Sequence, residues 1–381
     1  MKFRRYKMSE IATIAMSNVD KKTNEGETPV KLCNFVDVYR NWAITKDLIP
    51  SFMSATAKPQ EVERFTLSKG QVALTKDSET RDDIGIATYI ADNMDKVLLG
   101  YHCAVITPNS ALVDSKYLNA YMHSNIVHKY FENNASGSGQ RYTLSYNALL
   151  NIPVLLPDLE SQKEMGQIFS NIDRKIALNR QINDNLEAQL RLITSRYIFS
   201  CPNLEKKRIG EIATVKAGGD CPITFSKTRT RKCNIPIFSN GTEDRGLYGF
   251  TNKAKIEGHS ITVAARGTIG YCERRLMPFV PIIRLLAITP KEDGAYIYLH
   301  QVIRGMKFNK NGSVQQQLTV PEISFIEIPY PHSGILHEYN NVASPIVEMI
   351  ERNISENEIL TKQRDELLPL LMNGQASVNS D

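Results

Sequence analysis

The sequence repeats itself once, and this duplication constrains the fold more strongly than any other feature. The first copy opens on Ser9-Glu10-Ile11-Ala12-Thr13, and the second opens on Gly210-Glu211-Ile212-Ala213-Thr214. Further matches follow in the same order in both copies. They pair residues 105–108 with 287–290, Gly137-Ser138 with Gly312-Ser313, and 151–154 with 327–330. Because all the matches share one order, the chain is predicted to consist of two similar halves.

Each half ends in a segment with the periodicity of a long helix. Apolar residues recur in steps of three and four after Ile168, and a similar series follows Ile346 at a constant offset. A series sustained over this length is typical of a coiled-coil seam. The predicted seam consists of Ile168, Ile172, Ile176, Asn179, Ile182, Leu186 and Leu190 in the first helix, and of Ile346, Ile350, Ile354, Asn357, Leu360, Leu367 and Leu371 in the second.

The apolar stripe of each helix must be buried, and two arrangements can bury it. We expect the two helices to pair with each other, because each is the repeat of the other; the alternative is that each packs separately on its neighbouring domain. Asn179 and Asn357 occupy matching seam positions. A polar residue in a seam costs stability but can fix the register of the pair, and this is our interpretation of both asparagines. Two exposed asparagines at a loose point of the pair are the alternative.

Capping and helix-breaking residues indicate where the helices begin and end. Ser161, with Glu164 three residues later, resembles a capping box and places the start of the first helix there. A helix that continued from there to Phe199 would be about 55–60 Å long. Gly374 is expected to stop the second helix, and Pro345 requires either a first turn or a kink.

The parts before the helices combine short strands with a few helices. Segments 71–75 and 259–263 have the composition of strands bounded by Gly, Pro and Asn, whereas 115–130 has the pattern of a helix. The predicted fold class is therefore α+β. The predicted boundaries are 1–157 for the first globular domain, 158–200 for the central helix, 201–334 for the second globular domain and 335–381 for the C-terminal helix.

Three further motifs are the most specific in the chain. Residues 151–162, Asn-Ile-Pro-Val-Leu-Leu-Pro-Asp-Leu-Glu-Ser-Gln, lead into the first helix, and residues 364–374, Arg-Asp-Glu-Leu-Leu-Pro-Leu-Leu-Met-Asn-Gly, close the second. Residues 266–270 form the compact motif Arg-Gly-Thr-Ile-Gly. With the repeated openings, they resemble the specificity subunit of type I restriction-modification systems over nearly the whole chain. The second half departs from the pattern at 331–334, Pro-His-Ser-Gly, and the first half has a longer segment, 76–86, in place of the compact motif.

The resemblance implies a fold and a function. It implies two target-recognition domains separated by two conserved helices that form an antiparallel coiled coil. Each domain would recognise one half of a bipartite site in double-stranded DNA, and the helix pair would set the spacer. Two methyltransferase subunits, which carry the S-adenosylmethionine chemistry, would dock on the helices, and restriction subunits that use ATP and Mg²⁺ would join them. The chain itself would hold no cofactor and would not be an enzyme. A coiled-coil scaffold that binds only proteins is the alternative.

Motifs for catalysis are absent or badly placed. The sequence has no Gly-x-x-x-x-Gly-Lys-Ser/Thr loop for phosphate and no Asn/Asp-Pro-Pro-aromatic motif for amino methylation. Asp158, Asp173 and Lys175 resemble a nuclease pattern, but Asp173 and Lys175 would point about 200° apart on a helix. His123 and His128 would likewise point about 140° apart, which argues against a metal site.

Polar loops in both halves are the candidates for DNA contacts, since Gln, Asn and Arg present paired donors and acceptors to base edges and small residues allow close approach to phosphate. Ordinary solvated surface loops are the alternative. The first half provides Ser138, Gln140, Arg141 and Tyr142 in one loop and Lys76, Ser78, Thr80 and Arg81 in another. The second half provides Lys310, Asn311, Ser313, Gln315, Gln316 and Gln317 in the matching loop, Arg266, Thr268 and Tyr271 in a second, and Arg229, Arg231, Lys232, Asn240 and Arg245 in a third.

The overall composition is consistent with a cytoplasmic location. The net charge of +5 is a mild basic excess, which alone says little about a polyanionic partner. No apolar run is long enough to span a membrane, and no apolar segment follows the charged N-terminus as in a signal peptide. The six cysteines never form a Cys-x-x-Cys pair, so free thiols in a reducing compartment are expected.

Overall fold

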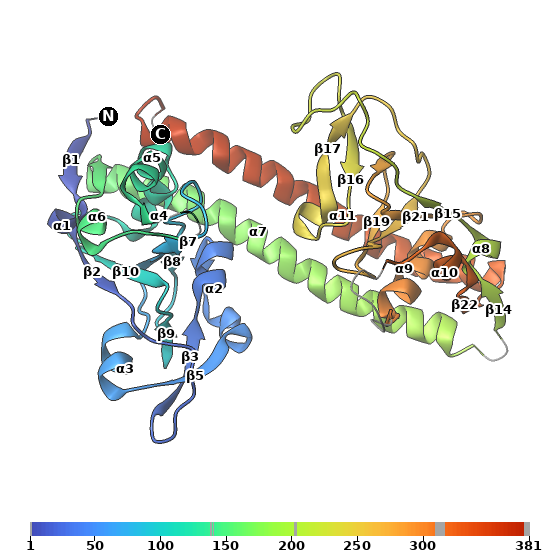
Figure 1. The fold of residues 1–381 in the computed structure, drawn as a ribbon, viewed down its shortest axis with the longest axis horizontal. Coiled ribbons are helices and arrows are strands. Elements are labelled where there is room, and N and C mark those ends of the chain that lie inside the picture. Colours follow the sequence, from blue (N-terminus) through green and yellow to red (C-terminus); the bar gives the residue numbers. More distant parts are fainter. Residues whose placement is uncertain (1, 138, 140, 202–203, 309–316, 377–381) are drawn as a thin grey trace. The chain divides into compact units, whose positions relative to one another are not determined.

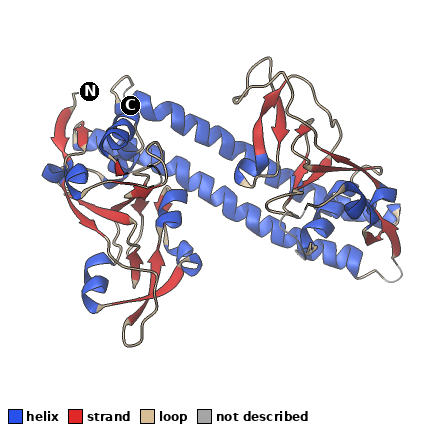
Figure 2. Ribbon diagram, viewed as in Figure 1, coloured by secondary structure: helices blue, strands red, loops and turns tan. Residues whose placement is uncertain are grey.

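A computed structural model describes residues 2–137, 139, 141–201, 204–308 and 317–376 of the chain (Figure 1). The chain forms two compact units. Unit 1 contains Met1–Asn179 with Ile354–Asp381, and unit 2 contains Arg180–Asn353. Each unit combines a domain of strands and short helices with part of each long helix (Figure 2). Both domains therefore confirm the predicted α+β class.

The core of unit 1 is a five-stranded sheet. Its strand order is β2 (Ala12–Met16), β10 (Cys103–Pro108), β6 (Val72–Thr75), β8 (Ala87–Ile90) and β4 (Ala43–Ile44). Three smaller sheets flank it: β1 (Arg4–Lys7) with β13 (Pro153–Leu156), β5 (Met53–Ala57) with β3 (Thr28–Cys33) and β9 (Val97–Leu99), and β11 (Ser136–Gly137) with β12 (Tyr142–Thr143) and β7 (Asp77–Ser78). The helices are α1 (Met8–Ile11), α2 (Phe35–Arg40), α3 (Pro59–Phe65), α4 (Ser115–Met122), α5 (Asn125–Asn134) and α6 (Tyr146–Leu150), with a 3₁₀ helix at Lys46–Ser51.

Unit 2 contains the same kind of domain in a shorter form. Its main sheet has the order β15 (Ala213–Ala217), β21 (Leu286–Pro290), β18 (Ser260–Val263) and β19 (Cys272–Arg275). The smaller sheets are β14 (Glu205–Arg208) with β22 (Glu327–Tyr330), and β17 (Leu247–Thr251) with β16 (Ile235–Phe238) and β20 (Val280–Pro281). The helices are α8 (Ile209–Ile212), α9 (Ala295–Gly305) and α10 (Val320–Phe325), with a 3₁₀ turn at Glu243–Gly246.

Strand pairing confirms the repeat and corrects its register at one point. The opening and central matches hold, because Thr13 pairs with Thr107 in unit 1 as Thr214 pairs with Thr289 in unit 2. The match of 151–154 with 327–330 was wrong by two residues. The Met8 amide donates to the Ile152 carbonyl, and the equivalent bond in unit 2 runs from Ile209 to Ile326 rather than to Ile328. The shared Ile-Pro dipeptide had suggested the wrong alignment.

The first long helix, α7, spans Leu159–Thr194 and continues through a π-helical turn, Ser195–Phe199. Its start is capped by Asp158, whose Oδ1 accepts from the Ser161 amide at 2.9 Å, so the predicted Ser161–Glu164 capping box was wrong. The side chain of Gln162, from the same motif, is buried and donates to the carbonyls of Pro157 and Leu112. This residue thereby ties the start of α7 to the first domain.

The second long helix, α11, spans Ser333–Met372. Pro345 therefore lies well inside the helix and not in its first turn. Gly374 has φ +69° and its amide donates to the Leu371 carbonyl, which confirms the predicted stop. Helix α7 begins three residues after β13, and α11 begins three residues after β22. When the two helices are aligned at these starts, equivalent residues differ by one helical turn from the alignment that the predicted seam residues suggested.

The two helices pair with each other within both units, and the pairing is antiparallel. In unit 1, Asn179 of α7 donates to Oδ1 of Asn357 at 2.9 Å and to Glu356 at 2.8 Å. In unit 2, Asn353 of α11 donates to Oδ1 of Asn183 at 2.8 Å. With the corrected offset, Asn179 is equivalent to Asn353 and Asn183 to Asn357, so the two polar contacts are copies of one another. The predicted pairing of the two helices is confirmed. The predicted equivalence of Asn179 and Asn357 was wrong, because these two residues contact each other instead of occupying matching positions of the repeat. Their role in fixing the register stays a prediction.

The apolar part of the seam was predicted only in part. The predicted positions that are buried are Ile176, Asn179, Leu190, Ile350 and Leu371. The predicted positions that are half-buried are Ile168, Ile172, Leu186, Ile346, Ile354, Asn357, Leu360 and Leu367. Ile182 is 43% exposed and was wrong, because Asn183 faces the partner helix instead. Buried residues that the pattern missed are Met165, Phe169, Tyr339 and Val347, which pack into the domain cores as well.

The two domains contact the helices through different chemistry. In unit 1, Trp42 lies between His123, stacked at 4.3 Å, and the Arg364 guanidinium, 5.1 Å from the indole ring. Burial and the charge of Arg364 lower the pKa of His123 to about 4, so this histidine is neutral. In unit 2, the buried Arg274 of β19 forms an ion pair with Glu187 of α7.

A second ion pair connects unit 2's domain to the other helix. Arg245 bonds Glu351 of α11 at 3.1 Å and Glu273 of β19 at 2.8 Å. Arg304 adds a contact of 2.7 Å to Glu187. These charges compensate one another where burial would otherwise penalise them.

The asparagine contact gives a first test. Asn179→Ala should lower the free energy of unfolding by about 1–3 kcal/mol, because the partners on α11 lose a buried donor. Asn179→Leu combined with Asn357→Leu should restore or exceed the wild-type value, because both polar groups are then removed together. Chemical denaturation of the purified chain measures both. A double variant as unstable as the single one contradicts the interpretation.

The Glu187 ion pair gives a second test. Glu187→Gln should destabilise the fold by about 3–5 kcal/mol at neutral pH, because the buried Arg274 loses its carboxylate. Burial raises the pKa of Glu187, but the charges of Arg274 and Arg304 outweigh burial and lower it. Its stabilising effect is therefore complete above the unfolded value of 4.5 and is lost as the pH falls through the lower folded pKa. Thermal unfolding at pH 7 and in acid should show the gap between wild type and variant closing, while the exposed control Glu358→Gln changes neither.

Candidate nucleic-acid interface

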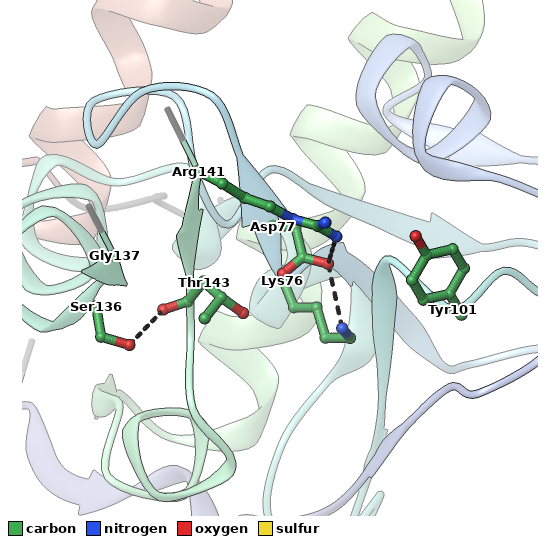
Figure 3. Close-up of a pocket in the computed structure, with 7 residues that line it drawn as sticks. All are labelled: Lys76, Asp77, Tyr101, Ser136, Gly137, Arg141 and Thr143. Carbon is green, nitrogen blue, oxygen red and sulfur yellow. Dashed lines mark hydrogen bonds and ion pairs between the residues drawn. The ribbon is translucent and has the colours of Figure 1, made fainter. Parts of the chain in front are cut away.

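Three side chains from separate segments, Lys76, His102 and Arg141, surround Asp77 in unit 1. Figure 3 shows Lys76 and Arg141 against the Asp77 carboxylate. The Asp77 carboxylate is 3.2 Å from Nζ of Lys76, 2.7 Å from Nδ1 of His102 and 3.6 Å from Nη2 of Arg141. Burial raises the pKa of Asp77, but hydrogen bonds from Thr143 and His102 and the charge of Lys76 outweigh it and lower the pKa. The carboxylate is therefore ionised at neutral pH. We call Lys76, Asp77, His102 and Arg141 the Asp77 cluster.

The Asp77 cluster borders an open cavity of about 440 Å³. The cavity is lined by Lys76, Asp77, Tyr101, Ser136, Gly137, Arg141 and Thr143. Two aromatic rings support the cations around it. Nζ of Lys76 lies 5.8 Å from the ring of Tyr101, and the Arg81 guanidinium lies 5.1 Å from the ring of Tyr142. Arg141 keeps 61% of its side chain exposed and is free to meet a ligand.

Local backbone constraints explain why these segments meet. The Lys76 amide donates to the His102 carbonyl at 2.9 Å, and the Leu144 amide donates to the Lys76 carbonyl at 2.8 Å. Gly85 closes the loop after β7 with φ +83°, and a Cβ there would lie 2.2 Å from the ring of Phe131. Only glycine fits at this point. The loop that carries Arg81 is thus held between β7 and β8.

The same backbone positions recur in unit 2. The Leu318 amide donates to the Ala265 carbonyl at 3.0 Å, as Leu144 donates to Lys76 in unit 1. Gly270, with φ +88°, would place a Cβ 2.4 Å from Phe308, as Gly85 would against Phe131. Unit 2 therefore contains a second version of the same surface.

Its side chains differ from those of unit 1. By these hydrogen bonds Arg266 takes the position of Asp77, and Gln317 takes that of Thr143. Nη2 of Arg266 donates to Oε1 of Gln317 at 2.7 Å. An acidic position in one unit is therefore a basic position in the other. Both predicted residues, Arg266 and Gln317, are brought together by the fold.

Asn240 connects the loops of this second surface. Its Oδ1 accepts from the Ala265 amide at 2.8 Å, and its Nδ2 donates to the Ile283 carbonyl at 2.7 Å. The Thr268 hydroxyl donates to the Asn240 carbonyl at 3.3 Å. The predicted role of Asn240 as a base contact conflicts with this geometry, because its amide is already engaged on both sides.

Two other predicted DNA contacts are part of the protein's own framework. Arg245 is committed to Glu273 and Glu351, so it is corrected to a structural residue. The Tyr271 hydroxyl donates to Glu273 at 2.7 Å, and the side chain is half-buried. Arg245 could not be recognised as structural from the sequence, because Glu273 and Glu351 are distant in the chain.

The remaining predicted residues lie on the surface or outside the described residues. Ser78 accepts from the Thr80 amide at 3.3 Å in a loop that also carries three acidic residues, Glu79, Asp82 and Asp83. Exposed residues before β16 are Arg229, Arg231 and Lys232. Those outside the described residues are Ser138, Gln140, Lys310, Asn311, Ser313, Gln315 and Gln316. Asp77, Tyr101 and His102 were missed as site residues, although Tyr101-His102 directly precedes a strand that the repeat had identified.

The described part of the chain brings no three His, Cys, Asp or Glu side chains together that could hold a metal ion. Lys175 of the nuclease-like pattern pairs with Glu356 at 3.4 Å. Within the described residues, no helix has both the length and the apolar character needed to span a membrane. The six cysteines are free thiols.

Comparison with known proteins identifies the family. The model of the type I restriction modification DNA specificity domain matches this chain over residues 2–188 and again over 203–368. The chain belongs to this family of duplicated DNA-specificity proteins. The expectation of a specificity subunit, rather than a methyltransferase or nuclease, is thereby confirmed.

Individual relatives agree with the family match. A Mycoplasma pneumoniae protein named as a type I specificity subunit is 31% identical over 186 residues, which are 46% of this chain and 56% of that relative. A second such protein from the same organism is 24% identical over 79% of this chain and 84% of its own. The solved S subunit of a type I system from M. genitalium, 15% identical, has a TM-score of 0.57 and covers 100% of this chain and 97% of its own, which shows the same fold.

Arg141 gives the test of the first surface. If Arg141 contacts a base, Arg141→Ala should weaken or relax recognition of one half-site only, by about 1–3 kcal/mol. Binding of the purified complex to duplexes altered in either half-site measures this. Lys69→Ala is the control, since Lys69 is exposed at the other end of β6. An equal loss on all sequences would make Arg141 a phosphate contact.

Proposed function

We propose that this chain recognises a bipartite site in double-stranded DNA, with one half-site bound by each domain. The observation that carries the proposal is the recurrence of one loop surface in both units with different side chains, Asp77 and Thr143 in one and Arg266 and Gln317 in the other. A shared scaffold with unlike polar groups suits the recognition of two unlike short sequences.

The chemistry of both surfaces fits duplex DNA. Lys76, Arg81 and Arg141 offer donors for phosphate and for guanine, and Asp77 holds Lys76 and Arg141 together. In unit 2, Arg266 and Gln317 offer a guanidinium and an amide side by side. Arg229, Arg231 and Lys232 would add phosphate contacts.

We further propose that the helix pair sets the spacer and binds two methyltransferase subunits. The continuous helix α7 contains 36 residues, about 54 Å in length. The asparagine contacts in both units would fix the register of the pair. Both helices also carry exposed apolar side chains that suit a protein partner, namely Leu178, Ile182, Leu192, Met349 and Ile359.

In this assembly the chemistry lies in other subunits. S-adenosylmethionine would be bound by the methyltransferase subunits, and ATP and Mg²⁺ by the restriction subunits. Methylome sequencing of cells with and without this gene tests the proposal as a whole. Loss of methylation at one split motif supports it. Unchanged methylation, together with no salt-dependent DNA binding, would favour the coiled-coil scaffold instead.

The spacer role has its own test. Four residues inserted into both helices, next to Ala177 in α7 and at the facing level of α11, would lengthen the pair by about 6 Å. The gap between two unchanged half-sites should then widen by about two base pairs, because each base pair rises about 3.4 Å. Methylome sequencing of the variant shows the gap directly. An unchanged gap argues against the helix pair as the determinant of spacing.

A further inference from the structure

An exposed turn of the second domain holds two consecutive non-glycine residues at positive φ. Ile283 has φ +51° and Arg284 has φ +60°, in the left-handed region that β-branched residues avoid. Ile283 is nonetheless 49% exposed, so burial of its side chain does not compensate for this conformation. Strain of this kind persists only where the surroundings hold it, and it is concentrated at functional sites.

Three hydrogen bonds hold the turn in place. The Ile283 amide donates to the Gly219 carbonyl at 2.9 Å, and the Arg284 amide donates to the Gly218 carbonyl at 3.0 Å. Asn240 donates to the Ile283 carbonyl at 2.7 Å. A Cβ on Gly218 would lie 2.7 Å from the Ile282 amide nitrogen, so the turn also requires glycine beneath it. The side chains of Ile283 and Arg284 are left facing outward.

The repeat shows what this turn corresponds to in unit 1. In unit 2, Gly219 forms a β-bridge with Ile282, and the Ile283 amide donates to the Gly219 carbonyl. In unit 1, Val19 forms the same β-bridge with Gly100, and the Tyr101 amide donates to the Val19 carbonyl. Ile283 and Arg284 therefore occupy the positions of Tyr101 and His102. Those two residues border the cavity of the Asp77 cluster or bond to Asp77 itself.

The turn also lies beside the second polar surface. Asn240 bonds both the Ile283 carbonyl and the Ala265 amide, and Ala265 directly precedes Arg266. Among the described residues, the Arg284 side chain has no hydrogen-bond or ion-pair partner, unlike Arg245, Arg266, Arg274 and Arg275 in the same unit. Arg284 is thus an exposed cation that no side chain in the described part of the chain engages.

We propose that Ile283 and Arg284 are specificity-determining residues of the second half-site, Arg284 through hydrogen bonds to base edges and Ile283 through contact with an apolar base group such as the thymine methyl. The proposal rests on the proposed DNA-reading function and extends it to residues outside the predicted set. Asn240 is the positioning residue that fixes the turn next to Arg266.

The experiment uses the full complex with its methyltransferase subunits, after methylome sequencing has given the wild-type target. Arg284→Ala should lower affinity for the mapped site by about 10- to 100-fold. The variant should discriminate less well between base pairs in the second half-site only, which is the half-site that Arg141→Ala leaves intact. Lys206→Ala is the control. Lys206 is an exposed cation on β14, which precedes β15, whereas Gly218 follows β15 at its other end. Lys206→Ala should therefore leave recognition of both half-sites unchanged.

Ile283→Gly separates function from fold. Glycine adopts positive φ without strain, so Tm should stay the same or rise while discrimination in the second half-site falls. A structural role for Ile283 predicts the reverse, a lower Tm with unchanged discrimination, and would overturn the proposal for this residue. Binding must be compared at one salt concentration, because phosphate contacts alone shift affinity with salt.

The outcomes distinguish this inference from the proposed function. A wild-type complex with no sequence preference would refute the proposed function. A wild-type complex that is selective, with variants at Ile283 and Arg284 that are equally selective in both half-sites, would refute only the inference. A uniform loss on every sequence would also refute it, since it would make Arg284 a phosphate contact.

Discussion

The antiparallel pairing of α7 with α11 is the constraint on which the rest of the structure depends. Each helix has an apolar stripe with polar interruptions, and the stripe is buried against the other helix and against a domain core at once. Because the pairing is antiparallel, the start of α7 meets the end of α11 in one unit, and the reverse holds in the other. Each unit is thus assembled from segments far apart in the sequence. The domains then attach by different means, an aromatic and cationic stack at Trp42 in unit 1 and buried ion pairs at Glu187 and Glu351 in unit 2.

The two domains share the geometry of their strands but differ in the side chains that their loops carry. The hydrogen bonds that close the loop after β6 recur after β18, and the required glycines recur at Gly85 and Gly270. At the ends of those strands, Asp77 is replaced by Arg266 and His102 by Arg284. A duplicated scaffold can therefore carry unrelated recognition surfaces without any change in its core, because the core residues and the variable residues lie on different parts of the strands.

The sequence predicted the duplication and the helix pair, because periodicity and repeated order are local properties of a chain. It failed where long-range contacts decide. Ile182 fits the seam pattern, yet Asn183, four residues after Asn179 and so on the same face of α7, contacts the partner helix instead. Arg245 is of a residue type that often contacts DNA, yet it forms ion pairs with two carboxylates that are distant in the sequence. Ile283 carries no signal at all in the sequence, since positive φ in a β-branched residue is visible only in the folded backbone.

The discontinuity of unit 1 has a consequence for how the protein is made. Leu368, Leu371 and Met372 belong to the same apolar core as Met8 and Phe169. During synthesis, the earliest domain therefore leaves the ribosome with its core unfinished and remains so until the latest helix emerges. The contiguous second unit, translated in between, is able to close first. The core of the first domain therefore cannot be completed before α11 has been translated, so its apolar surface stays uncovered at least for as long as the second unit takes to be made.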